Sequence, residues 1–351
     1  MTTSDAFREL KRRSTFTNVA EKNTRYITRI FDAMAGTEQG SMMESCKAGG
    51  ARCGSVYCDE CRHRKQLSML YRYKTYYKDK LDNNETLARD RLRWVSVLHN
   101  VVEINTKTQN DEIETIRNVE RSVEMMKAEV AAIGKKYRDR GIWLRGGVHL
   151  EIVDYKAFRQ AAEDGIATIK EKTLSSFISR MSNTDAEFIF LVHFHGLFDR
   201  GDMNDGELAK MFAERWNSAL RQVDISTLWD KVNAIQHDSN GRALKDDNGK
   251  YVRKKESQQL KHAFIAMANY CFSFSNDKLQ YARNWSQGQY TMEIDDEFDD
   301  NWNITRVATQ IGPAAQSKRM SVGHIRLLVE ASNAVNGNRH KGLDIRIDSK
   351  D

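Results

Sequence analysis

The segment from Phe188 to Phe198 constrains the fold most, because it is an almost uninterrupted hydrophobic run that carries two histidines, His193 and His195. Such a run predicts a buried β-strand. Residues two apart in a strand share a face, so both imidazoles are expected to point to one side of a sheet, with Phe194 on the other. A lone histidine in an apolar run is more often a hydrogen-bonded core residue. Two on one face can share a divalent metal ion that satisfies both.

A second predicted strand, residues 143–153, supplies the further ligand that such an ion needs. It offers Glu151 and, two residues earlier on the same face, His149, and either side chain can reach the two histidines if the strands are neighbours. We take Glu151 as the third ligand, with His193 and His195. Two imidazoles and one carboxylate leave coordination positions open, which suits Mg²⁺ or Mn²⁺ that also binds a phosphate oxygen.

Four of the five cysteines form a compact C-x6-C-x4-C-x2-C cluster: Cys46, Cys53, Cys58 and Cys61. Nearby glycines allow the tight turns of a metal-binding knuckle, and four thiolates suit a structural, tetrahedral Zn²⁺. His63 is a possible substitute ligand, and two disulfides are the alternative. The first residues lack the hydrophobic core of a signal peptide, so we expect a reducing, cytoplasmic location and zinc instead of disulfides.

The basic charge of the chain is modest but clustered. The 351 residues carry a formal net charge of +6. Basic runs occupy residues 8–13, 62–65, 72–80, 135–140 and 253–261, with Tyr71, Tyr73, Tyr76 and Tyr77 in or beside the third run. Most charge runs are solvated helix faces, but cations with interleaved aromatic rings suit a polyanion such as DNA. No apolar stretch of about 18 residues occurs, so no membrane span is expected.

Helical spacing and strand alternation together predict an α+β fold with a central antiparallel sheet and flanking helices. We expect helices over residues 1–40, 62–90, 110–138, 172–182, 202–223 and 257–275. We expect strands over residues 92–100, 143–153 and 187–198, and a hairpin around Asn240-Gly and Asn248-Gly. The chain length allows two domains or one with large appendages. We divide it into an N-terminal helical segment with the zinc knuckle (1–90), a central nuclease domain (91–285) and a C-terminal accessory region (286–351).

The predicted helix 257–275 carries a candidate nucleophile. Tyr270 lies about 80° from the centre of that helix's apolar seam, where a tyrosine can pack its ring while its hydroxyl faces a cleft. An ordinary boundary tyrosine has the same position. Tyr281 falls on the same flank if the helix continues.

The order of these parts resembles the rolling-circle replication initiators (Rep) of small plasmids, members of the HUH endonuclease superfamily. The resemblance covers about residues 46–345 in patches. It rests on the knuckle followed by Arg62-His-Arg-Lys, the strand Trp94-Val-Ser-Val-Leu-His, the strand Gly-Gly-Val-His-Leu-Glu151, the His193-Phe-His195 motif, the tyrosine-bearing helix and Asn338-Arg-His-Lys-Gly-Leu-Asp.

The resemblance implies an HUH-like fold and a metal-dependent enzyme that nicks and rejoins single-stranded origin DNA. Tyr270 would attack the scissile phosphate, which the metal polarises, and would leave a 5′-phosphotyrosine and a free 3′-hydroxyl. The family usually has a lysine three or four residues after the tyrosine, where this chain has Ser273, and the next lysine is Lys278. Lys261, His262 and a metal-bound water are candidates for that role, and Tyr281 remains the alternative nucleophile.

The expected partners are single-stranded DNA and an origin hairpin, with the helicase and polymerase of the host. The residues predicted to contact DNA are Arg62, Arg64, Lys65, Lys254, Lys255 and Lys261. A transposase or relaxase of the same superfamily is an alternative, as are a zinc-containing DNA-binding regulator without catalysis and a metal hydrolase of small phosphate esters. The absence of a Walker-type phosphate loop argues against a nucleotide enzyme of that type.

Overall fold

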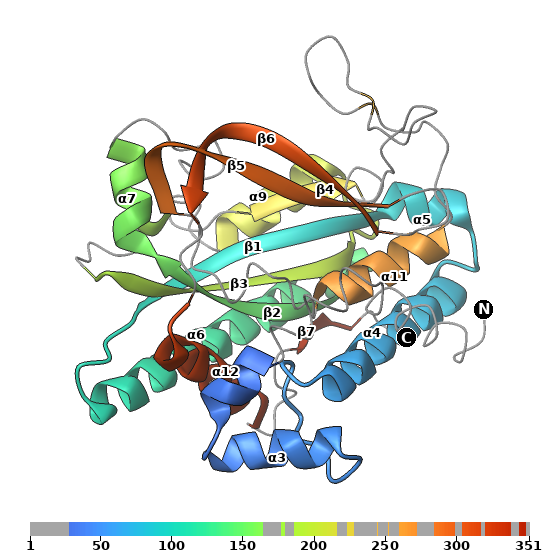
Figure 1. Cartoon of the computed structure of the whole chain (residues 1–351). Helices are drawn as coiled ribbons and strands as arrows, with labels where there is room; N and C mark the ends of the chain where they lie inside the picture. Colours follow the sequence, from blue (N-terminus) through green and yellow to red (C-terminus); the bar gives the residue numbers. More distant parts are fainter. Residues whose placement is uncertain are drawn as a thin grey trace.

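A five-stranded antiparallel sheet in the order β4-β1-β3-β2-β7 organises the fold (Figure 1). Its strands are β1 (Leu92–Glu103), β2 (Trp143–Asp154), β3 (Phe188–Asp199), β4 (Val223–Thr227) and β7 (Asp344–Ile347). The computed structural model describes residues 28–163, 177–179, 186–215, 223–227, 244, 252, 260–271, 284–298, 304–316, 320–337 and 344–348. The predicted α+β class with a central antiparallel sheet and flanking helices is confirmed.

The di-histidine strand β3 is central because it pairs along its whole length with β1 on one side and β2 on the other. Both of its edges are therefore paired, and the helices α6 and α11 contact it as well, so its side chains are buried on both faces, which explains why its sequence is almost continuously apolar. Within the β2–β3 pairing Gly146 lies opposite Gly196. A Cβ on Gly146 would lie 2.2 Å from the carbonyl oxygen of His195, so the two strands approach this closely only because a side chain is missing here.

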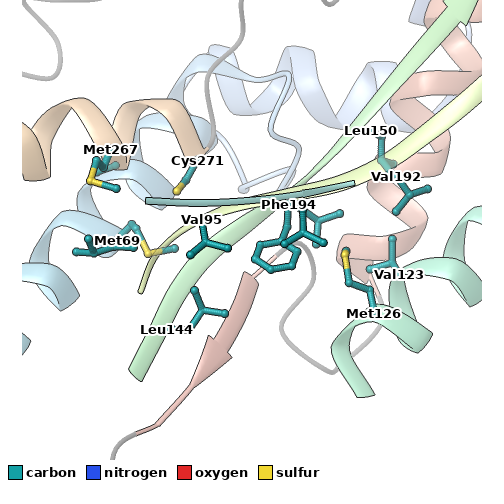
Figure 2. Close-up of a cluster of buried hydrophobic side chains, with 14 of the residues drawn as sticks. Met69, Val95, Val123, Met126, Leu144, Leu150, Val192, Phe194, Met267 and Cys271 are labelled. Atoms are coloured by element: carbon teal, nitrogen blue, oxygen red, sulfur yellow. The ribbon is translucent and has the colours of Figure 1, made fainter. Parts of the chain in front are cut away.

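Helix α6 (Gln109–Lys136) covers one face of the sheet, the face to which Phe194 points. Figure 2 shows Phe194 directed toward Val123 and Met126 of α6, and all three side chains are at most 1% exposed. Burying side chains of this size contributes roughly 1.5–3 kcal/mol each. The helix predicted over 110–138 is confirmed, and its apolar side chains are buried from Val119 to Ile133. The helix begins at a capping box formed by Thr108 and Asp111. Helix α12 (Val322–Gly337) packs beside α6.

The opposite face of the sheet carries the histidines and is covered by several separate elements. Helix α11 (Leu260–Cys271) packs on β3 and β2, and α4 (Asp59–Lys80) packs on α11 and on β2. A smaller apolar cluster at the other end of this face unites Val153, Ile189 and Leu191 with Phe177 and Ile178. Helix α7 (Tyr155–Glu163) follows β2 and contacts β5 (Asn284–Phe298), which forms a separate two-stranded sheet with β6 (Ile304–Gln316).

The predicted long helix over residues 62–90 is two helices. Helix α4 ends at Lys80, and α5 (Glu85–Arg91) begins after Asn84, whose side chain accepts a hydrogen bond from the backbone N–H of Leu87. Between the two helices Asp82 and Asn83 adopt positive φ angles of 48° and 55°. Among residues other than glycine, Asp and Asn tolerate this conformation best, so these two residues favour the break between the helices. The pattern of charged residues, from which the single long helix was predicted, does not show this preference.

Several further elements differ from the sequence-based expectations. The helix predicted over 202–223 is α9 (Asp205–Arg215), and β4 begins where the prediction ended. Strands β4 to β7 and α12 were not predicted, and the 3₁₀ turn Arg138–Arg140 follows α6. Near the N-terminus residues 28–34 are helical, as predicted, whereas α3 (Glu38–Lys47) extends beyond the predicted end of the helical region at residue 40. In the hairpin expected around Asn248-Gly, only Leu244 and Val252 are described, and the N–H of Val252 donates to the carbonyl of Leu244.

Strand β7 pairs with β2, so the C-terminal region contributes a strand to the central sheet. The largest apolar cluster likewise draws on α3, α4 and α12 as well as on the sheet. The division of the chain at residues 90 and 285 remains a prediction. Among the described helices, none combines the length and the apolar character that crossing a bilayer requires.

Candidate active site and metal centres

Three buried histidines meet on one face of the sheet. His149 of β2 lies directly opposite His193 of β3, and His195 lies opposite Gly147, which has no side chain to compete for space. The candidate ligand nitrogens of His149, His193 and His195, called here the histidine triad, all lie within 4.8 Å of one another. Three nitrogens bonded to one ion at about 2.1 Å with tetrahedral angles lie about 3.4 Å apart. Movements of about 1 Å per ring would therefore suffice, and the triad could hold a metal ion.

The third member of the triad is His149 and not Glu151, which we had predicted as the third ligand. Glu151 lies opposite Leu191, two residues along the strand beyond the pair of His149 and His193, and its side chain is 41% exposed. Its Oε1 atom is 3.9 Å from Nε2 of His193, within ion-pair distance. The carboxylate is thus adjacent to the triad and is a candidate fourth ligand.

Hydrogen bonds orient two of the three rings. Nε2 of His149 lies 2.8 Å from the carbonyl oxygen of Cys271, which can only accept, so Nε2 carries the proton and Nδ1 is left for a metal. Nδ1 of His195 lies 2.7 Å from Oγ of Ser96, which leaves Nε2 of His195 as the ligand atom. Partners of this kind set the tautomer and the direction of a ligating imidazole.

Ser96 is itself held by Trp94. The indole N–H of Trp94 donates to Ser96 Oγ at 2.9 Å, and the Trp94 ring stacks on the His195 ring with centroids 5.7 Å apart and planes 13° apart. Both residues occur in a strand quoted above for its resemblance to the Rep family, where their residue types alone predict no role. Their alternation on β1 places them on one face, and only the pairing of β1 with β3 shows that this face carries His195.

The helix that carries Tyr270 ends at the triad. Tyr270 belongs to α11, and the carbonyl that His149 binds is that of the next residue, Cys271. The last carbonyls of a helix have no partner within it, so His149 satisfies one of them. The side chains of Tyr270, Lys261 and His262 lie outside the described part of the structure, as do Tyr281, Lys254, Lys255, Ser273 and Lys278 entirely.

The four clustered cysteines have the geometry of a zinc knuckle. Sγ of Cys46 lies 3.7 Å from that of Cys61 and 3.6 Å from that of Cys58, and Cys53 lies 3.7 Å from Cys61. Tetrahedral zinc with bonds of about 2.3 Å places its sulfurs about 3.8 Å apart, whereas a disulfide requires about 2.05 Å. All four thiols are unbonded to one another, so the disulfide alternative is wrong in this structure and the cluster fits Zn²⁺.

The surroundings of the knuckle assist ionisation of one thiol. A hydrogen bond from Cys53 lowers the pKa of Cys58 to about 5, and backbone N–H groups of the first turn of α4 act in the same direction. Gly49 and Gly54 adopt φ angles of 88° and 73°, which lets the loop fold back on itself. His63, the suggested substitute, is not part of the described cluster.

The basic run after the knuckle is divided between the interior and the surface. The Arg62 side chain is only 5% exposed and forms an ion pair with Asp59, and burial lowers the pKa of Arg62 to about 10. Arg62 is therefore placed to support the knuckle from inside. Arg64 is exposed and Lys65 is half-buried, so contact with DNA remains a prediction for these two.

Comparison of the chain with models of protein families, with curated proteins and with solved structures found no match. The likeness to HUH initiators therefore rests on the motifs quoted from the sequence. The fold shows an antiparallel sheet that carries one candidate metal site and a separate cysteine cluster that suits zinc.

Proposed function

We propose that this protein is a metal-dependent endonuclease and strand transferase for single-stranded DNA, acting as a rolling-circle replication initiator. One observation carries the proposal, the 2.8 Å hydrogen bond between Nε2 of His149 and the carbonyl oxygen of Cys271. It joins the candidate metal site to the residue next to Tyr270, although the two are far apart in the sequence. A candidate nucleophile and a candidate Lewis-acid site thus belong to adjoining elements.

The chemistry follows from these parts. His149, His193 and His195 would hold a divalent ion, which supplies polarisation of the phosphate. The Tyr270 hydroxyl oxygen would attack phosphorus and lose its proton, while the bond from phosphorus to the 3′ oxygen breaks and that oxygen takes up a proton. A 5′-phosphotyrosine and a 3′-hydroxyl result, and attack by a 3′-hydroxyl reverses the step and rejoins the strand. Three imidazoles suit Mn²⁺ or a later transition metal better than Mg²⁺.

In a replication initiator the free 3′-hydroxyl would serve a host polymerase, with a host helicase opening the duplex. The substrate would be the single strand of an origin, presented as a hairpin. The knuckle has a supporting part in this proposal, since four protein ligands leave no open position for a substrate.

The test is formation of a covalent adduct. The zinc-loaded, full-length protein is mixed with Mn²⁺ and labelled single-stranded oligonucleotides, including hairpins from its own replicon, and denaturing electrophoresis reveals a protein–DNA adduct that peptide mass analysis maps. We expect the adduct on Tyr270, and none with Tyr270→Phe or His193→Ala. His99→Gln is the matched control, because His99 is equally buried but bonds to Glu129 of α6, away from the triad.

The outcomes separate the candidates. An adduct on Tyr281 would keep the function and correct the nucleophile. The absence of any adduct with origin DNA, in Mn²⁺, Mg²⁺ or Co²⁺, would refute the nuclease and favour a zinc-containing DNA-binding protein without catalysis.

A further inference from the structure

Helix α4 has two different faces. The buried face packs against the rest of the fold and includes Cys61, Arg62, Gln66, Met69, Leu70, Tyr73 and Tyr76. The opposite face is open to solvent and carries Arg64, Ser68, Tyr71, Thr75 and Lys78. These five positions repeat at intervals of four and three residues, so they form one continuous line along the helix. Figure 1 shows α4 at the periphery of the molecule, beside α11.

Tyr71 is the one large aromatic side chain on this exposed line. Of the four tyrosines in the region, Tyr73 is fully buried with its ring 6.2 Å from Trp143, Tyr76 stacks on Trp143 at 3.9 Å, and Tyr77 donates its hydroxyl to the carbonyl of Asn83. These three have structural roles. Tyr71, in contrast, is 63% exposed. An exposed ring flanked by cations is the arrangement that proteins use to stack unpaired bases.

The charge around Tyr71 is strongly positive. Between residues 62 and 80 the helix has seven basic residues and one acidic residue. Arg64 and Lys78 lie two turns before and two turns after Tyr71, within about 20° of its direction, and the line from one to the other spans about 21 Å. The exposed Glu60 ends this line at the N-terminus of the helix. The charge therefore complements a polyanion and not a cationic partner.

Helix α4 packs beside the sheet face that carries the triad through its buried face, and the exposed line lies on the solvent side of the same helix. The Tyr73 hydroxyl donates to the carbonyl oxygen of Arg145 at 3.3 Å, which fixes α4 against β2. Arg145 shares its side of β2 with His149, four residues further along. Burial lowers the pKa of Arg145, and a hydrogen bond to Asp348 opposes this, so Arg145 forms an ion pair at this edge of the sheet.

We propose that the stripe of Arg64, Tyr71 and Lys78 on α4 binds single-stranded DNA, with one base stacked on Tyr71 and phosphates paired with Arg64 and Lys78. The proposal rests on the proposed function only in that the same strand would be the substrate. Binding at the stripe needs no divalent metal and no chemistry at the triad, so the two can fail separately.

The experiment measures the affinity of the zinc-loaded, full-length protein for labelled oligothymidine by fluorescence anisotropy, without added divalent metal. Tyr71→Ala should weaken binding between about 5-fold and 150-fold, because stacking on one aromatic ring has that effect. Tyr71→Phe keeps the ring and should bind within about 2-fold of the wild type. Met125→Ala is the matched control, since Met125 is also exposed, at 45%, but belongs to α6 on the other face of the sheet.

The salt dependence tests the phosphate contacts. Arg64→Gln and Lys78→Gln should each reduce the slope of log affinity against log salt by about 0.7, the value for one contact with a single strand. Arg117→Gln is the matched control, since it removes an equal charge from a 66% exposed side chain of α6.

Each outcome decides between the proposals. Tyr71→Ala that binds like the wild type would overturn the stripe, and an adduct formed by the same variant would leave the nuclease standing. Tyr71-dependent binding by a wild-type protein that forms no adduct would support the stripe and refute the nuclease. Tyr71-dependent binding of polyglutamate, without binding of oligothymidine, would overturn the proposal in favour of an acidic protein partner.

Discussion

Replacing Ser96 by alanine should weaken metal binding at the histidine triad without removing any ligand. Ser96 Oγ lies 2.7 Å from Nδ1 of His195 and 2.9 Å from the indole nitrogen of Trp94. When Nε2 of His195 binds a metal, Nδ1 must carry the proton, and Ser96 is the acceptor within reach. Ser96→Ala removes that acceptor, so the hydrogen bond that sets the tautomer and the orientation of the His195 ring is lost.

The magnitude follows from the change in that hydrogen bond. A hydrogen bond between neutral groups contributes about 0.5–1.5 kcal/mol, and one to a charged group about 1.5–3 kcal/mol. A metal ion makes the His195 ring partly cationic, so the bond to Ser96 gains about 1–1.5 kcal/mol on metal binding. The Kd for the metal should therefore rise roughly tenfold, the lower end of the range for such supporting residues.

Isothermal titration of the zinc-loaded protein with Mn²⁺ measures this affinity, and Ser96→Thr, which keeps the hydroxyl, should restore it. Ser122→Ala is the matched control, because Ser122 is buried in α6 under the opposite face of the sheet. An unchanged Mn²⁺ affinity in Ser96→Ala, together with lost binding in His195→Ala, would refute the argument that Ser96 orients the ring.

Three further predictions concern stability. Chelation of zinc, or Cys58→Ser, should lower the unfolding temperature by at least about 5 °C, because the buried thiols lose the ion that joins them; a chelator without effect on thermal unfolding would contradict the knuckle. Gly146→Ala should cost about 1–3 kcal/mol in denaturant unfolding, because its Cβ would lie 2.2 Å from the His195 carbonyl oxygen. Gly323→Ala, whose Cβ meets nothing within 4 Å, is the control, and equal stabilities of the two variants would refute the close approach. Burial raises the pKa of Glu330, so its charge opposes folding at neutral pH and the penalty disappears as acid protonates it. Glu330→Gln should thus raise the unfolding temperature slightly at pH 7 but not below about pH 4, and an equal gain at both pH values would contradict this reasoning.

Much of the fold follows from local patterns. The alternation in β1, the apolar run of β3 and the helical spacing of α6 are properties of neighbouring residues, and these three elements are present. Strand β7 was not predicted, because it has only four residues and becomes a strand by pairing with β2. A segment that short has too few positions to show a period. The end of α4 was not predicted, because Asp82 and Asn83, which adopt positive φ angles, have charged residues on both sides. The charge pattern therefore continues through the break between the helices.

The sequence by itself determined the cysteine cluster and two of the three histidines of the triad. The spacing of the cysteines predicted the knuckle, and the His193-x-His195 pattern predicted two imidazoles on one face. These are short-range properties, because residues close in the chain have few ways to be arranged.

Only the tertiary structure decided which residues complete these sites. His149 and Glu151 lie on the same side of β2. Which of them lies next to the two histidines of β3 depends on the register between the two strands, and the sequence of β2 alone does not fix that register. In the same way, Tyr71 differs from its neighbouring tyrosines only through what α4 packs against. Register and burial arise from contacts between segments that are distant in the sequence. The free energy of each contact depends on both segments, so the pattern of one segment cannot predict the register or the burial.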